Sequence, residues 1–458
     1  VVDNSFSEAS SLHIPNDYYT YGGITKPVVL ETIPDVYIRY VHFTPRYTDG
    51  KWSANIRILL ENISDTAHIA RIKLFLDEKD IKNALLDTAF NIESKSNKTI
   101  EIEAEFENVS EWAPESPILY LLNTMLFLDG NEAAADDLIE RVGFRTIEVK
   151  GSDILLNGRK IFIQGFNRHE DHPAGGCSIT PELAAQDIAL MTDLGANSVR
   201  TSHYPNDERF LDMCDEKGIL VWEESHARGL SLEQMLNPNF EKQCIDCINE
   251  MINDHYNHPS IYVWGILNEC DSTSPKGKEI YARLFAQIKS LDKSRPVTFA
   301  TNKHFEDICF DLVDIVSLNL YYGWYIQGMR SRESIEEAYL QELEWVNTTP
   351  GKGKPIIISE FGAGALYGYR TPIQSKWSEE RQAEILDHTL SIYLNRPEIS
   401  GAYIWQFCDV RITEGKYEML RPRLMNNKGV VDEYRRPKLA YGTVKKHFTR
   451  LNDEFVNY

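Results

Sequence analysis

The feature of this 458-residue sequence that most limits its fold is a series of eight short apolar runs, separated by longer stretches with helical periodicity. Apolar runs of this length indicate strands that are buried on both faces, as in parallel sheets covered by helices. Eight strand–helix repeats over about 300 residues predict a closed (β/α)8 barrel. An open doubly wound sheet is the alternative, but no glycine-rich phosphate loop follows the first run. The runs are KIFIQGF, ANSVRTSH, ILVWEES, YVWGILNE, VTFAT, IVSLNLY, PIIISEF and AYIWQF.

The sequence before these runs has a different pattern. From Tyr37 to Arg145, short segments such as ARIKLFLD and KTIEIEAEF alternate apolar and polar residues and are separated by turns. Period-two alternation at this spacing predicts a small antiparallel β-sandwich. We therefore expect three units: residues 1–34, a sandwich over residues 35–147 and the barrel over residues 148–458.

The composition excludes several classes of protein. An apolar fraction of 42% argues for a globular chain with a large core and against disorder. The formal net charge of -21 argues against nucleic acid or an anionic membrane as a partner. No apolar run approaches the ~20 residues that a membrane-spanning helix requires. The seven cysteines are scattered, and Cys244 and Cys247 have no second pair at zinc spacing, so we expect free thiols in a reducing, cytoplasmic setting. No signal peptide is visible.

Polar residues gather at the ends of six of the eight apolar runs. In a (β/α)8 barrel, these ends form one rim, where the chemistry of barrel enzymes is found. A single polar end can be explained as a cap for the following helix, but six at one rim indicate a site. They are Arg168, His169, Glu170 and Asp171 after the first run, Thr201, Ser202 and His203 after the second, Glu223 and Glu224 after the third, Asn268 and Glu269 after the fourth, Asn319 after the sixth, and Ser359 and Glu360 after the seventh.

Two of these residues, Glu269 and Glu360, form a candidate catalytic pair. The barrel places them on opposite sides of the mouth, and two carboxylates facing one cavity are the minimal equipment for cleaving a glycosidic bond. One, protonated, gives its proton to the leaving oxygen, and the other, ionised, attacks the anomeric carbon. Asn268 can hydrogen-bond a sugar hydroxyl, and Trp405 can offer an apolar platform to a sugar face.

Two other interpretations of the rim stay open at this point. The carboxylates can belong to a structural network of salt bridges. Alternatively, Glu223, Glu224, His226 and His203 can hold a metal ion, although their spacing matches no recognisable metal motif.

The run ends N-E and S-E-F-G, together with FNRHED, RTSHYP and SLNLYYGWY, resemble the retaining glycoside hydrolases of family 2, clan A. The resemblance is closest to bacterial β-glucuronidases and extends from Asn16 onward. It is specific in the barrel and looser in the sandwich, where EWAPESPILY is similar to a stretch of the family's immunoglobulin-like domain. It implies an immunoglobulin-like sandwich before a (β/α)8 barrel, and a retaining exo-glycosidase that hydrolyses terminal β-D-glucuronides by double displacement.

The resemblance also implies roles for individual residues. Glu269 matches the family's acid/base and Glu360 its nucleophile. Asp171 matches a residue that contacts the outer hydroxyls of the sugar, and Asn268 matches the residue that hydrogen-bonds the 2-hydroxyl. Further pocket positions are matched by His203, Asn319, Tyr325 and Trp405.

The resemblance gives a specific meaning to Asn426-Asn427-Lys428-Gly429. An Asn-x-Lys motif after the eighth strand separates the family's glucuronidases from its β-galactosidases. A sugar carboxylate that leaves water needs a cation and a hydrogen-bond donor, which Lys428 and Asn426 can supply. Without its position after the eighth run, the tetrapeptide would be read as a turn with a solvated lysine.

The sequence departs from the family pattern in three places. Only the tail of the family's N-terminal jelly-roll domain is recognisable, as NDYYTYGGITKPVVLETIP within residues 1–34. The segment SHARGLSLEQMLNPNF after the third run is short, so we expect an open mouth that favours larger aglycones or oligosaccharides, unless a neighbouring subunit covers it. An arginine that some relatives place before the Asn-x-Lys motif is out of register, and Arg421 and Arg423 are both candidates.

Several alternatives remain from the sequence. Within the family these are a β-galacturonidase, which differs at C4 of the sugar, or a β-galactosidase. A carbohydrate-binding remnant without turnover is the alternative from another class. The expected partner is a glucuronide conjugate or a uronic-acid-containing oligosaccharide, and a homo-oligomer stays open. No cofactor is expected, and no metal, because Glu224 and His226 are out of register for the magnesium site of galactosidase relatives.

Overall fold

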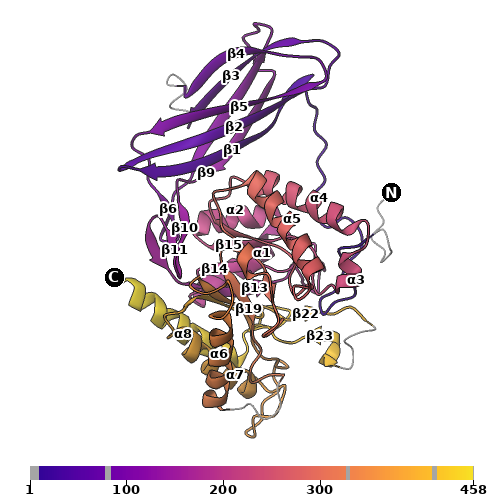
Figure 1. The fold of residues 1–458 in the computed structure, drawn as a ribbon, viewed down its shortest axis with the longest axis vertical. Coiled ribbons are helices and arrows are strands. Elements are labelled where there is room, and N and C mark those ends of the chain that lie inside the picture. The colour runs from indigo at the N-terminus through magenta and orange to yellow at the C-terminus, as the bar shows by residue number, and fades with distance from the viewer. Residues whose placement is uncertain (1–9, 78–83, 326–330, 415–419, 457–458) are drawn as a thin grey trace.

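The structure is a computed structural model that describes residues 10–77, 84–325, 331–414 and 420–456. It contains a β-sandwich set on one side of a larger body, in which helices surround a parallel barrel (Figure 1). The fold class predicted from the sequence, a sandwich followed by a (β/α)8 barrel, is confirmed.

Two antiparallel sheets form the sandwich. In β2 every second residue from Trp52 to Asn62 is buried, as the period-two pattern predicts. The apolar side chains among them, from Trp52 to Leu60, share one core with Ile72 and Leu74 of the facing sheet. The sheets are β1 (Val36–Thr48), β2 (Lys51–Asn62) and β5 (Ser96–Phe106) on one side, and β4 (Leu86–Ile92), β3 (His68–Leu76), β8 (Tyr120–Leu128) and β9 (Asp136–Val142) on the other.

A small three-stranded sheet joins the sandwich to the barrel and closes the barrel's amino-terminal end. Its Ile147, Ile154 and Leu156 pack into one cluster with barrel residues such as Tyr262 and Tyr403. A hairpin whose two strands have two residues each lies beside this region. The strands are β6 (Trp112–Ala113) and β7 (Ser116–Pro117) in the hairpin, and β10 (Ile147–Lys150), β11 (Asp153–Leu156) and β12 (Arg159–Ile161) in the sheet.

The barrel has eight strand positions, all parallel. Phe299 splits the fifth strand into two short pieces, and pairing of the first strand with the last closes the barrel. Each predicted apolar run overlaps one of the eight strand positions. The strands are β13 (Ile163–Arg168), β14 (Ser198–Thr201), β15 (Leu220–Glu224), β16 (Ile261–Gly265), β17 (Val297–Thr298) with β18 (Ala300–Thr301), β19 (Val316–Asn319), β20 (Ile356–Phe361) and β21 (Ile399–Ile404).

Helices follow seven of the eight strand positions. The fifth strand is followed by the 3-10 helix η2 (Phe310–Leu312) instead, so one wall of the mouth is built from turns. Within the described ranges, no helix is long and apolar enough to cross a membrane. The α-helices are α1 (Pro181–Asp193), α2 (Glu208–Lys217), α3 (Leu232–Met235), α4 (Phe240–His255), α5 (Pro275–Leu291), α6 (Arg332–Val346), α7 (Glu379–Tyr393) and α8 (Leu439–Val456).

Sequence signals mark most helix starts. The side chains of Thr180, Asp207, Ser274, Ser331 and Ser378 cap helices by accepting a hydrogen bond from the first turn. These caps hold the helices at fixed distances beyond the strand ends, so the loops between them define the mouth.

The segment before the sandwich runs across the barrel mouth. Residues 10–35 contain no helix or strand, and the first nine residues of the expected unit 1–34 lie outside the described part of the chain. Ser11 donates a hydrogen bond to Gln243 of α4 at 2.7 Å, and the ring of Tyr18 stacks on His169 with centroids 4.5 Å apart. Asn16 accepts a hydrogen bond from Arg228 at 2.9 Å. The segment is therefore part of the rim.

Candidate active site

The fourth strand ends earlier than the sequence predicts. It stops at Gly265, and Ile266 and Leu267 continue as a buried turn. Leu267 and Glu269 have φ angles of 51° and 54°, in the left-handed region where the chain turns away from the strand direction. The backbone N–H of Glu269 donates to the carbonyl of Ala300 at 2.9 Å. The turn thus carries Glu269 to the mouth and fixes it against the fifth strand.

Glu360, near the end of the seventh strand, is almost fully buried. Arg200 Nη1 donates to its Oε1 at 3.0 Å, and the hydroxyl of Tyr321 donates to its Oε2 at 2.8 Å. Burial and the nearby charge of Glu269 raise the pKa of Glu360 to about 7, against the opposing effect of Arg200. Donors therefore orient both oxygens of Glu360. The raised pKa means that the carboxyl group gains its charge only as the pH approaches neutrality.

Glu269 is more open to solvent than Glu360. Asn319 Nδ2 donates to its Oε1 at 2.9 Å, and Arg228 Nη2 lies 3.5 Å from its Oε2. Ser359 donates to Asn319 Oδ1 at 2.8 Å, which fixes the amide so that its nitrogen faces Glu269. Glu269 and Glu360 border one cavity of about 740 Å³.

A fully buried guanidinium, Arg200, organises the floor of this cavity. Besides Glu360, it binds both carboxylate oxygens of Glu224, at 2.9 Å and 3.0 Å, and donates to Asn268 Oδ1 at 2.9 Å. Glu224 also contacts His203 Nδ1 at 2.8 Å, and the His203 ring stacks on Trp405 with centroids 5.1 Å apart. One arginine therefore connects the second, third, fourth and seventh strands.

Cations line one end of the cavity. Arg421 Nη2 donates to Asp17 Oδ2 at 2.8 Å and to the hydroxyl of Tyr325 at 3.2 Å. Lys428 Nζ lies 5.3 Å from the centre of the Tyr325 ring and 3.5 Å from Asn426 Oδ1. Lys428 is buried, and burial lowers its pKa. This end is suited to a carboxylate that leaves water on binding.

Several buried polar atoms beside the cavity have no hydrogen-bond partner in the described chain. They include Asn268 Nδ2, His203 Nε2 and Asp17 Oδ1. Buried polar groups in folded proteins are nearly always satisfied, so unpaired atoms at a cavity indicate where a ligand bonds. Burial holds the pKa of His203 well below its usual value and its Nδ1 faces Glu224, so its Nε2 is an acceptor. One donor and two acceptors suit a ligand with several hydroxyl groups.

The structure brings most of the predicted site residues together. Glu269, Glu360, Asn319, Tyr325, Trp405 and Lys428 line the cavity, and Asn268, His203 and Asn426 are buried behind this lining.

Asp171 has a different environment. It does not line the cavity, and its carboxylate accepts hydrogen bonds from the Tyr21 hydroxyl and the Arg411 backbone N–H, both at 3.1 Å. Burial raises the pKa of Asp171 to about 6. Of the two candidate arginines, Arg421 lines the cavity, whereas Arg423 pairs with Glu433 at 2.9 Å.

Sequence reasoning missed four residues of the site. Tyr321 contacts Glu360 directly, although the same YYGWY stretch had drawn attention only to Tyr325. Asp17 comes from the segment before the sandwich, and Arg228 from the loop after the third strand. The remaining one, Arg200, was visible as a charged residue inside an apolar run, which is a usable signal because a buried charge requires partners.

The four residues considered as metal ligands do not gather. Glu223 pairs with His255 at 2.8 Å, whereas Glu224 faces Arg200 and His203, because neighbours on a strand point to opposite faces. His226 does not join either pair in the described contacts.

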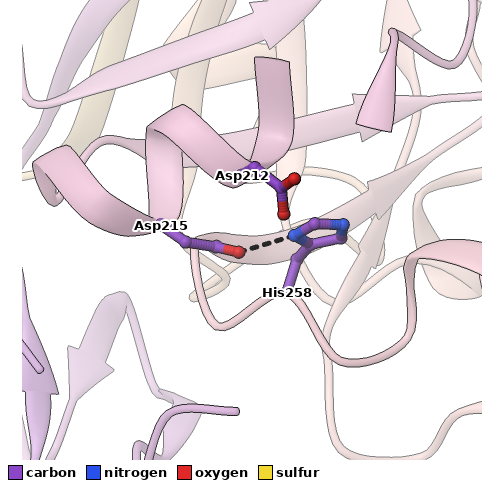
Figure 2. A group of neighbouring side chains, drawn as sticks. All are labelled: Asp212, Asp215 and His258. Carbon is purple, nitrogen blue, oxygen red and sulfur yellow. Dashed lines mark hydrogen bonds and ion pairs between the residues drawn. The ribbon is translucent and has the colours of Figure 1, made fainter. Parts of the chain in front are cut away.

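Among the described residues, one group does have metal-ligand spacing, and it lies away from the cavity. It consists of Asp212, Asp215 and His258 (Figure 2). His258 Nδ1 lies 2.5 Å from Asp215 Oδ2, and Arg141 of the sandwich pairs with Asp212. The group thus has a cationic partner and joins the sandwich to the barrel.

Comparisons with known proteins agree with this geometry. The family model "Glycosyl hydrolases family 2, TIM barrel domain" matches residues 147–453, and "Glycosyl hydrolases family 2" matches residues 36–145. A β-glucuronidase of Streptococcus agalactiae is 30% identical over 95% of this chain and 72% of its own. A canine β-glucuronidase is 30% identical over 96% of this chain, which spans only 65% of that protein's length.

A solved structure is more similar still. The crystal structure of a family 2 β-galacturonidase from Eisenbergiella tayi bound to galacturonate is 48% identical, with a TM-score of 0.93, over 98% of this chain and 78% of that one.

Proposed function

Because this chain belongs to glycoside hydrolase family 2, we propose that it is a retaining, exo-acting β-uronidase that removes a terminal β-D-hexuronic acid from a carbohydrate. One observation carries the proposal: the cavity that holds Glu269 and Glu360 also holds Lys428 and Arg421 at one end. Paired carboxylates suit glycosidic bond cleavage, and the cations suit the C6 carboxylate of a uronic acid.

In the first step, Glu360 attacks the anomeric carbon and forms an ester with the sugar. Glu269 gives its proton to the glycosidic oxygen, so that the leaving group departs neutral. Arg200 and Tyr321 orient the Glu360 carboxylate for attack through the contacts at 3.0 Å and 2.8 Å. Asn268 Nδ2, which has no partner in the described chain, is placed to donate to a sugar hydroxyl.

In the second step, Glu269 acts as a base. It takes a proton from water, the water oxygen attacks the anomeric carbon, and the ester to Glu360 breaks with restored configuration. Arg228 and Asn319 hold Glu269 in place through both steps. No cofactor is needed for this chemistry.

The configuration at C4 separates two candidate substrates. The sequence alone predicts a β-glucuronide, and the curated relatives at about 30% identity carry that name. The Eisenbergiella tayi β-galacturonidase is 48% identical, and this greater similarity favours a β-galacturonide. We therefore propose the galacturonide as the better substrate and the glucuronide as the second.

The test is a panel of nitrophenyl β-glycosides: galacturonide, glucuronide, galactoside and mannoside. We expect turnover of the uronides, with the galacturonide fastest, and a β-configured first product by NMR. Glu360→Ala should remove turnover, and added azide should restore it as the α-glycosyl azide, because a small anion fits where the carboxylate was.

Every other outcome of this assay would indicate a different function. Turnover of the neutral glycosides alone would make the chain a β-galactosidase or related enzyme, and an α-configured first product would exclude retention. Binding of uronic acid without turnover of any substrate would favour a carbohydrate-binding remnant. As a control, Glu306→Gln changes an exposed carboxylate near the mouth and should leave all rates unchanged.

A further inference from the structure

The wall of the cavity opposite the cations has its own composition. It is built by Asn302, His304 and Phe305, which follow the fifth strand, and by Ala338 and Gln341 of α6. The cationic end is built by residues that follow the eighth strand, Arg421 and Lys428. In the order of the barrel, the fifth and eighth strands are three positions apart, so the two walls face each other across the mouth.

Glu269 is connected to this second wall. Lys303 Nζ donates to the backbone carbonyl of Glu269 at 3.1 Å and to Asn302 Oδ1 at 2.9 Å. The lysine therefore ties the wall to the residue that protonates the glycosidic oxygen. With the uronic acid held at the cationic end, the group on the other side of that oxygen must lie against this wall.

Phe305 is the most unusual residue of the wall. Its side chain is 52% exposed, and its φ of 63° lies in the left-handed region, which bulky side chains rarely adopt. Its ring is supported by Trp345, with centroids 5.6 Å apart. Such backbone conformations gather at ligand-contact sites. An exposed, supported ring at the rim of a cavity is suited to stacking against a sugar face.

The polar groups of the wall are neutral or already paired. Asn302 and Gln341 carry amides, and His304 Nδ1 lies 2.7 Å from the buried carboxylate of Glu342. Amides donate and accept hydrogen bonds, as hydroxyl groups do. This wall therefore offers hydroxyl-binding groups and an aromatic face, but among its described residues it has no unpaired charge for a second carboxylate.

We propose that this wall is the leaving-group subsite and that it takes a neutral hexose. The inference rests on the proposed function and extends it: the natural substrate is an oligosaccharide in which a terminal hexuronic acid is β-linked to a neutral sugar. Residues Asn302, Phe305 and Gln341 hold that neutral sugar while Glu269 protonates the linking oxygen.

Binding of a neutral sugar to this subsite can be measured through the reverse of the cleavage step, in which that sugar acts as the acceptor. A hydroxyl of the bound hexose attacks the anomeric carbon of the glycosyl-enzyme, the bond from that carbon to Glu360 breaks, and Glu269 takes the hydroxyl proton. The products are a disaccharide and the free Glu360 carboxylate. Atoms balance without any further reactant.

The experiment uses the full chain, trapped with 2-deoxy-2-fluoro-β-D-galacturonosyl fluoride or its glucuronosyl epimer. Mass spectrometry checks that the adduct lies on Glu360. Recovery of activity is then followed in buffer alone and with increasing methyl β-D-galactoside, methyl β-D-glucoside or methyl β-D-glucuronide. We expect the neutral glycosides to accelerate recovery saturably. The charged glycoside should give less than about a tenth of that acceleration, and a tenfold difference in binding constant corresponds to about 1.4 kcal/mol.

Two variants test the wall itself, each compared with its own recovery in buffer. Phe305→Ala and Gln341→Ala should raise the acceptor concentration for half-maximal acceleration by about 5–10-fold, a usual effect of truncating a main contact. Gln341→Ala lies on the exposed face of a helix, so it keeps the test valid if Phe305→Ala fails to fold. The matched controls are Tyr47→Ala, an exposed aromatic on the sandwich, and Glu344→Ala, an exposed residue of α6 outside the cavity lining.

The failures of the two proposals are distinguishable. If neither fluorosugar labels Glu360, the proposed function is overturned. If labelling occurs but neutral glycosides do not accelerate recovery, or do so equally in wild type and both wall variants, the leaving-group subsite is overturned while the uronidase stands. Acceleration by the glucuronide as strong as by the neutral sugars would overturn the neutral-hexose assignment.

Discussion

The protonation of Glu360 links the geometry of the site to its pH dependence. Burial and the charge of Glu269 raise the pKa of Glu360 to about 7. A nucleophile must be ionised, so kcat/KM for an activated nitrophenyl uronide should fall as the pH drops below about 7. In Glu269→Gln the repelling charge is gone while burial remains, so the acid limb should move to lower pH.

This prediction is measured as the pH profile of kcat/KM for nitrophenol release, because the activated leaving group departs without an acid. Glu306→Gln, which removes an exposed carboxylate instead, should keep the wild-type profile. An unmoved acid limb in Glu269→Gln would show that Glu269 does not raise the pKa of Glu360.

Lys428 should distinguish charged from neutral sugars. A charge-assisted contact of its ammonium with a sugar carboxylate contributes roughly 1.5–3 kcal/mol. Lys428→Ala should therefore lower kcat/KM for a uronide by about 10–100-fold, whereas the slow rate on a galactoside should barely change. Arg423→Ala is the matched control, because Arg423 pairs with Glu433 and does not line the cavity. Equal losses on both substrates would reduce Lys428 to a structural role.

At the scale of elements, the segment of residues 10–35 contributes Asp17 to the cavity. Burial alone would raise the pKa of Asp17, but Arg228, Arg421 and Lys428 outweigh it and hold the pKa well below its usual range. The ionised carboxylate orients Arg421 through its Oδ2, and its Oδ1 lies 3.5 Å from Arg228 Nη2. Asp17→Ala should therefore lower kcat/KM for uronides by at least about 10-fold, the effect of losing one charged hydrogen bond.

The control for this prediction is Glu31→Ala, an exposed residue of the same segment, which should keep wild-type kinetics. The melting temperature is measured alongside. If Asp17→Ala lowers the melting temperature but leaves kcat/KM unchanged, the segment stabilises the rim without contributing to the site.

The strands of the barrel could be predicted from the sequence because buried parallel strands need continuous apolar runs. Their ends could not. The turn that carries Glu269 depends on positive φ at Leu267, a residue type that gives no turn signal. The split at Phe299 and the 3-10 helix η2 in place of a fifth α-helix are likewise features that the apolar runs do not predict.

Within the site, residues on strand ends could be predicted because barrel geometry brings them together. Asp17 could not be placed by that reasoning, because it reaches the mouth from outside the barrel. Tyr321 and Tyr325 are four residues apart in one loop, and only the path of that loop places Tyr321 on Glu360 and Tyr325 beside Arg421.

At the scale of the whole molecule, the sandwich is fastened to the start of the strand that leads to Glu269. Arg145, which follows the sandwich, is 4% exposed. Its Nε donates to the carbonyl of Pro259 at 2.9 Å, and its Nη2 donates to the carbonyl of Ile261 at 2.8 Å. A side chain at Gly143 would meet Pro259 at 2.8 Å, so only glycine permits this close approach.

Removing this guanidinium should weaken the connection between the two bodies. Arg145→Ala leaves the buried carbonyl of Pro259 without its described donor, which costs about 1–3 kcal/mol, whereas the carbonyl of Ile261 keeps a hydrogen bond from Arg295 Nε at 2.9 Å. We expect the free energy of unfolding in urea to fall by about 1–3 kcal/mol, whereas Arg46→Ala, which breaks an exposed pair with Glu103, should cost less than about 1 kcal/mol. Circular dichroism and tryptophan fluorescence should coincide in the wild type and separate in Arg145→Ala, as the sandwich and barrel unfold independently. If Arg145→Ala and Arg46→Ala have equal effects and all transitions coincide, other contacts, such as Arg141 with Asp212, hold the two bodies together.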